Sequence, residues 1–251
     1  PAIMALPIGQ ESAFKGIVLL LDQKAITWAG DETGAKYTVS DEIPADMVDQ
    51  VKEYREKLIE QVAETDDALM EKYLNGQEIS VNEVKTALRK ATIDYKLVPI
   101  FCGSSLRNKG VQPLLDAIVE YLPSPMDIKE IKGINPKTET EEARQLTPEE
   151  PFSGLAFKIQ VDPHVGRLTY VRVYSGKLDS GTYTMNANKR SKERIGRLLL
   201  MHANDREEIK QAQAGEIVGI VGLKDTKTGD TLCDEAHPIT FEGIEFAEPV
   251  I

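Results

Sequence analysis

The sequence has few cysteines and no long hydrophobic run, and each absence excludes a class of protein. Cys102 and Cys233 are the only cysteines among 251 residues, and neither has a partner at C-x-x-C spacing. Two such cysteines cannot build a disulfide framework, a cysteine-rich metal site or a dithiol redox motif. No apolar stretch approaches the roughly 20 residues that a bilayer-spanning helix needs. We therefore expect reduced thiols, no membrane partner and a cytoplasmic location.

The chain is also short of positive charge. It carries 30 Lys and Arg against 41 Asp and Glu, which gives a formal net charge of −11. Residues 1–150 hold 17 basic and 27 acidic residues, whereas residues 151–251 hold 13 and 14. This balance argues against wrapping of nucleic acid by the whole chain, and we expect no binding to DNA. A local basic patch on the second part is still compatible with it.

The common nucleotide-binding and catalytic motifs are missing. No G-x-x-x-x-G-K-[ST] string occurs, and the segment 30–36 has its lysine displaced, which is typical of a hairpin turn. Asp31-x-x-Gly34 is too short a pattern to carry a function, and the string 108–111 ends in Val where guanine reading needs a carboxylate. The three histidines are scattered, without a second metal ligand or a nucleophile at a useful spacing. We therefore expect no metal site and no catalysis by this chain as it stands.

The first part of the chain predicts a small antiparallel sheet followed by helices. Short apolar runs separated by a glycine-containing turn indicate strands. Apolar residues then recur every three or four positions, and Ser80 and Glu83 have capping-box spacing. The predicted strands are 17–21, 25–28 and 37–39, and the predicted helices are 44 to about 62, 66–74, and one that begins at Ser80.

Residues 97–102 form a continuous apolar run of the kind that buried strands have, and it ends in a Gly-Ser-Ser loop. Ligands of open α/β sheets bind beyond the carboxyl ends of strands, where such loops present backbone amides. The loop is therefore a candidate ligand contact, with a generic strand-to-helix turn as the alternative. A helix that covers this strand is predicted from Val111, Leu114, Leu115, Ile118 and Leu122.

Residues 127–150 are polar, charged and proline-spaced, which indicates a linker. Beyond them apolar residues alternate with period two between recurrent turn signals, which predicts a closed barrel or sandwich of short strands. Between two of these strands lies a basic run with a single acid. Phosphate backbones are bound chiefly by such clusters, although a solvated hairpin tip is the alternative. The candidate RNA-binding residues are Lys189, Arg190, Lys192, Arg194 and Arg197.

Several strings along the chain are distinctive, namely Leu6-Pro7-Ile8-Gly9, Phe14-Lys15-Gly16-Ile17-Val18, Lys24-Ala25-Ile26-Thr27-Trp28, Ile43-Pro44-Ala45, the segments 98–105 and 108–116, and then 162–168, 172–176, 194–197, 201–204 and 222–226. These strings resemble bacterial translation elongation factor G, a translational GTPase. Together they cover essentially the whole chain. The start of the chain is similar to the insertion in the GTPase domain of that family, the middle to its last nucleotide-binding segment, and the rest to its second domain.

The resemblance implies an α+β fold class. An N-terminal α/β unit, made of the insertion and a remnant of a P-loop GTPase domain, would be followed by an all-β translation-factor barrel. The start Pro1-Ala2-Ile3-Met4 shows neither an initiator Met nor a signal-peptide pattern, which fits an internal fragment. The implied parts are the insertion at 1–93, the GTPase-domain remnant at 94–125, a linker at 126–147 and the barrel, domain II, at 148–251.

The resemblance also implies a function. The chain would be a fragment of a ribosomal translocase that couples GTP hydrolysis to tRNA–mRNA movement. The parent factor would bind GTP or GDP together with Mg, whereas this fragment would bind no cofactor. The barrel would contact small-subunit ribosomal RNA. The insertion would contact the large-subunit stalk protein through the acidic helix around Glu53, Glu56 and Glu60. Two alternatives stay open, namely a ribosomal-protection or recycling paralogue and a stand-alone ribosome-binding module. The implied guanine-contacting loop is Gly103, Ser104, Ser105 and Leu106, where Ser-Ser replaces the usual Ser-Ala.

Overall fold

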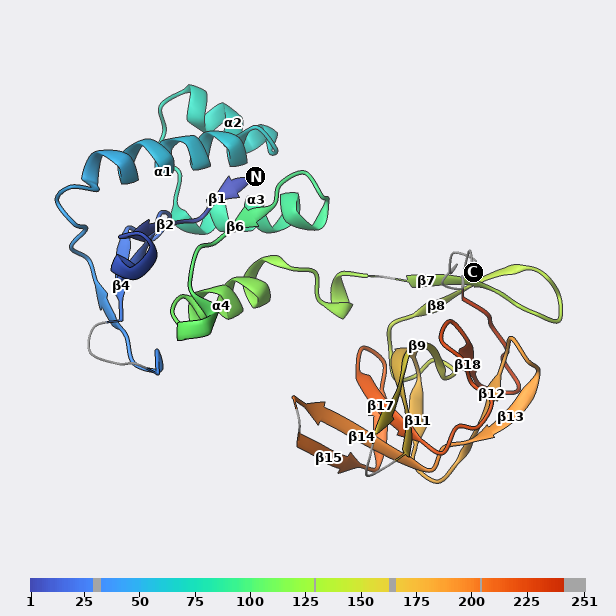
Figure 1. The fold of residues 1–251 in the computed structure, drawn as a ribbon. Helices are drawn as coiled ribbons and strands as arrows, with labels where there is room; N and C mark the ends of the chain where they lie inside the picture. The colour runs from blue at the N-terminus through green and yellow to red at the C-terminus, as the bar shows by residue number, and fades with distance from the viewer. Residues whose placement is uncertain (29–32, 129, 163–165, 204, 242–251) are drawn as a thin grey trace, which may run out of the picture. The chain divides into compact units, whose positions relative to one another are not determined.

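The computed structural model describes residues 1–28, 33–128, 130–162, 166–203 and 205–241 (Figure 1). The chain divides into two units, Pro1–Pro123 and Ser124–Ile251. Each unit has its own apolar core. Within the described ranges, no helix is long and apolar enough to cross a membrane.

The first unit opens with the small antiparallel sheet that the sequence predicts. Its four strands follow chain order, and the predicted apolar runs lie in them or at their ends. A separate pair of parallel strands joins the start of the unit to its later part. The antiparallel strands are β2 (Ala5–Ile8), β3 (Gly16–Leu19), β4 (Lys24–Thr27) and β5 (Thr38–Ser40), and the parallel pair is β1 (Ala2–Ile3) with β6 (Pro99–Ile100).

Four helices complete the first unit, and local sequence signals set most of their ends. The Asp66 side chain accepts hydrogen bonds from the first turn of the second helix, and Ser80 and Glu83 form the predicted capping box on the third. The first helix begins at Val48, because residues 45–47 form a turn, and not near Pro44 as the sequence suggested. The helices are α1 (Val48–Ala63), α2 (Asp67–Leu74), α3 (Val81–Ile93) and α4 (Val111–Tyr121).

The predicted buried strand and its covering helix are more exposed than the sequence indicated. β6 has only two residues, and Ile100 is 43% exposed. On α4 the residues that the periodicity placed inside are partly exposed, and Pro113, Ala117 and Tyr121 are buried instead. The reason is that β6 pairs only with β1 among the described residues, so there is little sheet for α4 to cover. The exposed large apolar residues of α4 and its end are Leu114, Leu115, Ile118, Val119 and Leu122.

The second unit is an antiparallel sheet of eight strands, in the order β13-β12-β18-β9-β10-β17-β14-β15. Strands that lie far apart in this order contribute to one apolar core, as Leu198, Ile220 and Leu232 do. The sheet therefore curls around its core, which confirms the predicted all-β second half. The strands are β9 (Ser153–Asp162), β10 (Gly166–Ser175), β12 (Tyr183–Asn186), β13 (Ser191–Arg194), β14 (Arg197–His202), β15 (Asp205–Ile209), β17 (Ile217–Val221) and β18 (Thr231–Cys233), with β11 (Lys177–Asp179) paired to β16 (Gln211–Gln213).

The segment 126–147, predicted as a linker, contains a hairpin of β7 (Glu130–Ile134) and β8 (Glu141–Gln145). Ile134 and Thr240 exchange two backbone hydrogen bonds of 2.8 Å, which tie the hairpin to a late part of the unit. Ile131 packs on a small cluster that contains Ile239. Composition could not reveal this, because the partners are about a hundred residues away in the chain.

Candidate functional site

The predicted guanine-contacting loop is a closed turn between β6 and α4. The Ser104 N–H donates to the Lys109 carbonyl oxygen at 2.8 Å, and the Lys109 N–H donates back to the Ser104 carbonyl oxygen at 3.0 Å. Between them, Ser105–Arg107 form one turn of 3-10 helix. Gly110 follows with a φ of 81°, and a Cβ there would lie 2.9 Å from the Cys102 carbonyl oxygen. Glycine is therefore required for the loop to close.

The structure brings Gly103, Ser104, Ser105 and Leu106 together in this loop, but they are not equivalent. The Ser104 N–H is already bonded within the turn. Ser105 and Leu106 are exposed, and in the described part of the chain their N–H groups have no acceptor. The loop can therefore donate two backbone hydrogen bonds to an outside acceptor such as a carbonyl oxygen.

A turn of the antiparallel sheet holds this loop in place. The Asn108 side-chain amide donates to the Thr33 carbonyl oxygen at 3.2 Å, and the Gln112 amide donates to the Gly34 carbonyl oxygen at 3.0 Å. A Cβ on Gly34 would lie 2.4 Å from the Arg107 carbonyl oxygen. The glycine thus permits a close backbone approach that spacing alone did not reveal. The Asp31-x-x-Gly34 pattern and the segment 30–36 fall partly on residues 29–32, outside the described residues.

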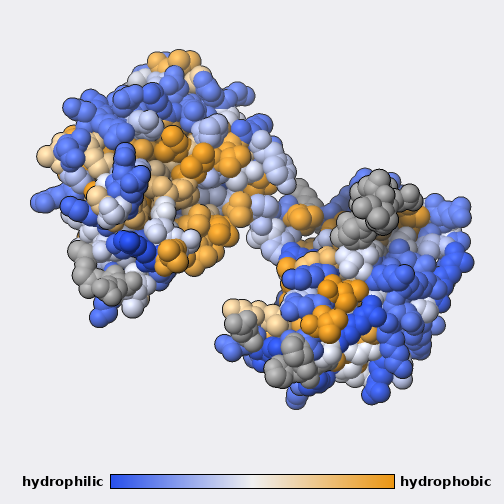
Figure 2. Space-filling model, viewed as in Figure 1, coloured by the Kyte–Doolittle hydropathy of each residue, from blue (hydrophilic) through white to orange (hydrophobic). Residues whose placement is uncertain are grey.

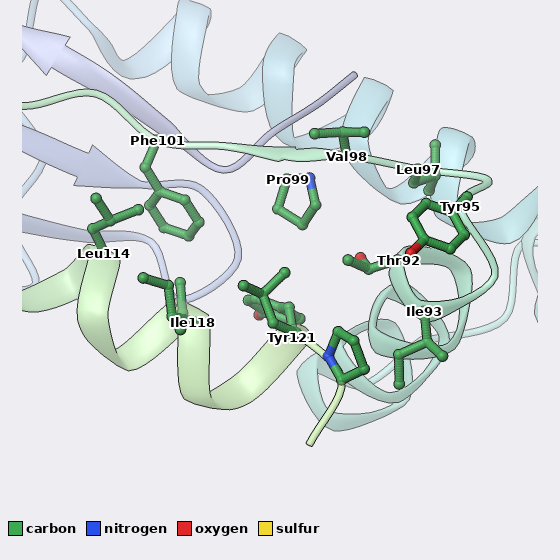
Figure 3. Close-up of a pocket in the computed structure, with 13 residues that line it drawn as sticks. Thr92, Ile93, Tyr95, Leu97, Val98, Pro99, Phe101, Leu114, Ile118 and Tyr121 are labelled. Carbon is green, nitrogen blue, oxygen red and sulfur yellow. The ribbon is translucent and has the colours of Figure 1, made fainter. Parts of the chain in front are cut away.

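A cavity of about 370 Å³ lies between α4 and the segment that leads from α3 into β6 (Figure 3). Leu114 and Ile118 line it from the helix, and Leu97, Pro99 and Phe101 line it from the opposite side. None of the described residues that line it is charged. Figure 2 shows a hydrophobic surface in this part of the first unit. The cavity offers apolar contact rather than chemistry.

The predicted RNA-binding residues share the β12–β13 hairpin and the start of β14, but most of their side chains are engaged within the unit. The Lys189 ammonium donates to the Asp225 carbonyl oxygen, and the Lys192 Nζ lies 5.2 Å from the centroid of the Tyr183 ring. Among the described residues, the Arg194 side chain has no hydrogen-bond or ion-pair partner, although its backbone pairs with Tyr183 in the sheet. The other contacts are Lys189 with Asp230 (3.3 Å), Lys192 with Glu235 (3.5 Å), Arg197 with Glu208 (3.9 Å), and Arg190 with the Pro136 carbonyl oxygen (3.3 Å).

Glu193, the single acid of this run, is almost fully buried, with 3% of its surface exposed. Its carboxylate accepts from the N–H groups of Lys224 (2.9 Å), Asp225 (2.9 Å) and Thr226 (2.7 Å), and from the Thr226 hydroxyl (2.9 Å). Burial by itself raises the pKa of Glu193, but these donors outweigh it and leave the pKa below its usual value. An ionised carboxylate therefore holds the segment 224–226. The sequence alone did not indicate this role, because there Glu193 is one acid in a basic run.

Side chains from β10 and from the residue before β18 hold the rest of this segment. The Arg167 guanidinium donates to the carbonyl oxygens of Lys224 and Thr226. Asp230 accepts from the Lys227 N–H at 2.7 Å and from the Asn186 amide at 2.8 Å. The side chains of Lys224 and Lys227 are themselves exposed, and no interaction of theirs occurs among the described residues.

Metal chemistry has no visible centre in the described residues. No group of three or more His, Cys, Asp or Glu is placed there to hold a metal ion. His237 pairs with Asp234 at 2.9 Å and His202 lies 3.7 Å from Glu207, both on the surface, while His164 lies outside the described residues.

Comparison with known proteins identifies part of this architecture. Residues 151–235 match the family model "Elongation factor G domain 2". Among solved structures, the crystal structure of a protein from Thermus thermophilus aligns with a TM-score of 0.72 and 26% sequence identity. The alignment covers 97% of this chain and 34% of that one, so the chain spans about a third of the length of that protein. Within the second unit, residues 151–235, which include the clamped segment at 224–227, are therefore similar to elongation factor G domain 2.

Proposed function

We propose that this chain is a segment of a translational GTPase of the elongation factor G type. It would contribute ribosome-contacting surfaces to a factor that uses GTP hydrolysis to move tRNA and mRNA. The observation that carries the proposal is the domain 2 match at residues 151–235. Support also comes from the strings in residues 1–125 that resemble the GTPase domain of the same family.

The loop at Ser105 and Leu106 would serve the parent factor as one contact to guanine. The two N–H groups that have no acceptor among the described residues suit a carbonyl oxygen, and the turn is already closed by backbone hydrogen bonds, which reduces the ordering needed when the base binds. The sequence has no G-x-x-x-x-G-K-[ST] string, so phosphates and Mg would be held by residues of the parent factor that are not in this sequence.

The exposed acidic face of α1 would meet the large-subunit stalk protein. Glu53, Glu56 and Glu60 are all exposed along one helix, and Lys57 pairs with Glu53 at 2.5 Å. A charged face of this kind raises the rate of encounter with an oppositely charged partner more than it raises affinity.

Two measurements on the purified chain test this function. We expect the fluorescently labelled chain to bind ribosomal subunits saturably at low salt, and we expect no GTP hydrolysis above the protein-free blank. Absence of subunit binding under these conditions contradicts the proposed function. Measurable GTP turnover contradicts the assignment of catalysis to the rest of the parent factor.

A further inference from the structure

We propose that residues 223–228 are a preformed contact for an RNA phosphate backbone and that Glu193 is the positioning residue that shapes it. The proposal rests on the proposed function, because it names which surface of the second unit meets ribosomal RNA. It also differs from the sequence-based candidate, since it moves the contact from the 189–197 run to the segment opposite it.

The amide side of the segment is fixed by a buried negative charge. Three consecutive N–H groups, from Lys224 to Thr226, point at the two oxygens of Glu193. Burying an ionised carboxylate is unfavourable unless donors saturate it, and here four donors do so. Glu193 is not part of the apolar core of the unit. The consequence of its four hydrogen bonds is a single backbone conformation for residues 224–226.

The carbonyl side of the segment faces cations. Arg167 donates to the carbonyl oxygens of Lys224 and Thr226, and Lys189 donates to that of Asp225. Lys189 is also paired with Asp230, but within the described residues Arg167 has no carboxylate partner. Among the described residues, the positive charge of Arg167 beside the segment therefore meets carbonyl oxygens and no carboxylate.

The groups that the clamped segment displays are those that bind phosphate. The side chains of Lys224 and Lys227 are exposed and without partners in the described ranges, and two of the three nearby acids, Glu193 and Asp230, are turned inward. Only Asp225 is an exposed acid in the segment. Lys side chains supply a large share of contacts to nucleic-acid backbones, and a backbone already ordered loses less entropy on binding.

The chemistry favours the RNA backbone over the bases. Residues 223–228 read Leu-Lys-Asp-Thr-Lys-Thr and contain no aromatic side chain on which an unpaired base could stack. The contact should therefore be independent of base identity and sensitive to salt, because each phosphate that is neutralised releases counterions.

The decisive variant is Lys224→Gln/Lys227→Gln in the full chain, measured against purified small ribosomal subunits over a series of KCl concentrations. We expect weaker binding, and a slope of log K against log [KCl] that is shallower by about 1 to 2. The matched control is Lys177→Gln/Lys210→Gln, which removes the same charge from exposed positions in β11 and just before β16. We expect the control to keep the wild-type slope.

A second variant tests the positioning role. Glu193→Gln removes one negative charge, so simple electrostatics predicts tighter RNA binding. We expect the opposite: faster hydrogen exchange of the 224–226 amides and weaker subunit binding, because the displayed lysines lose their fixed placement. The control is Glu207→Gln, an equal charge change on the exposed strand β15. Thermal unfolding of both variants identifies any general loss of fold.

The outcomes separate this proposal from the proposed function. If the wild-type chain does not bind subunits, the proposed function fails and this proposal fails with it. If the chain binds and the 224/227 variant matches wild type or its control, only this proposal fails. If the variant loses binding to intact subunits but not to protein-free small-subunit RNA, the partner is a ribosomal protein and the phosphate assignment is wrong.

Discussion

Glu83 makes three contacts at the start of α3. It pairs with Lys72, and it accepts from the Ser80 N–H at 3.0 Å and from the Ser80 hydroxyl at 2.8 Å. The bond to Lys72, followed by those to Ser80, lowers the pKa of Glu83 from 4.5 to about 2. Because the folded-state pKa is depressed, the resulting stability is present above pH 4.5 and is lost as the pH falls towards 2.

The corresponding prediction concerns Glu83→Gln. We expect the free energy of unfolding of the first unit to depend less on pH between 4.5 and 2 in this variant than in wild type. Urea denaturation at several pH values measures it. Glu71→Gln serves as the control, because Glu71 is an exposed residue of α2 whose side chain makes no contact among the described residues. An unchanged pH profile in Glu83→Gln would falsify the capping role.

At the scale of the element, the apolar periodicity of α4 correctly predicted a helix but wrongly predicted which of its residues are buried. The sequence predicted the helix, yet four of the five residues that it placed inside are 43–56% exposed. An apolar stripe identifies the face that a helix can bury, but whether a partner is present depends on other segments. In the described first unit, β6 pairs only with β1, so the sheet beside α4 has two short strands.

This difference can be measured by mutation. Leu115 is 56% exposed on α4, whereas Leu88 on α3 is completely buried. We expect Leu115→Ala to change the free energy of unfolding by less than about 0.5 kcal/mol, as surface substitutions do. We expect Leu88→Ala to cost about 2–5 kcal/mol, because it leaves a cavity in a packed core. Equal costs in urea denaturation would show that α4 is covered in solution.

At the scale of the whole molecule, the chain is two units with separate cores. The core of the second unit draws all its residues from positions 152–232, so its apolar contacts need no residue of the first unit. We therefore expect residues 124–251, expressed alone, to unfold in one cooperative transition. Its urea midpoint should coincide with one transition of the full chain, as measured by near-UV circular dichroism. A non-cooperative loss of signal would contradict this independence.

Local signals predicted much of this architecture. Asp66, Ser80 and Glu83 act on N–H groups within three residues, and Asn75-Gly76 ends α2 where the sequence indicated. Period-two alternation likewise identified the all-β second half. Such features depend on backbone groups only a few residues away, so they can be recognised without any knowledge of the fold.

The candidate sites were only partly predictable. Gly103 to Leu106 do form one loop, but the bonds that hold it, from Asn108 and Gln112 to residues 33–34 and between Ser104 and Lys109, could not be read from the sequence. In the 189–197 run, net charge suggested a binding surface, although four of the five cations are engaged with partners elsewhere in the unit. Composition counts charges but does not show which of them face one another.

The sequence by itself determined that the helices form, the capping box of α3, the α+β division and the resemblance to a translation factor, because these depend on short-range pattern and residue identity. Only the tertiary structure decided that residues 126–147 include a hairpin, that α4 keeps an exposed apolar face, and that Glu193 clamps the segment 224–226. The physical reason is common to all three. Each depends on hydrogen bonds or apolar contacts between residues distant in the chain, and these exist only once the fold has brought the partners together.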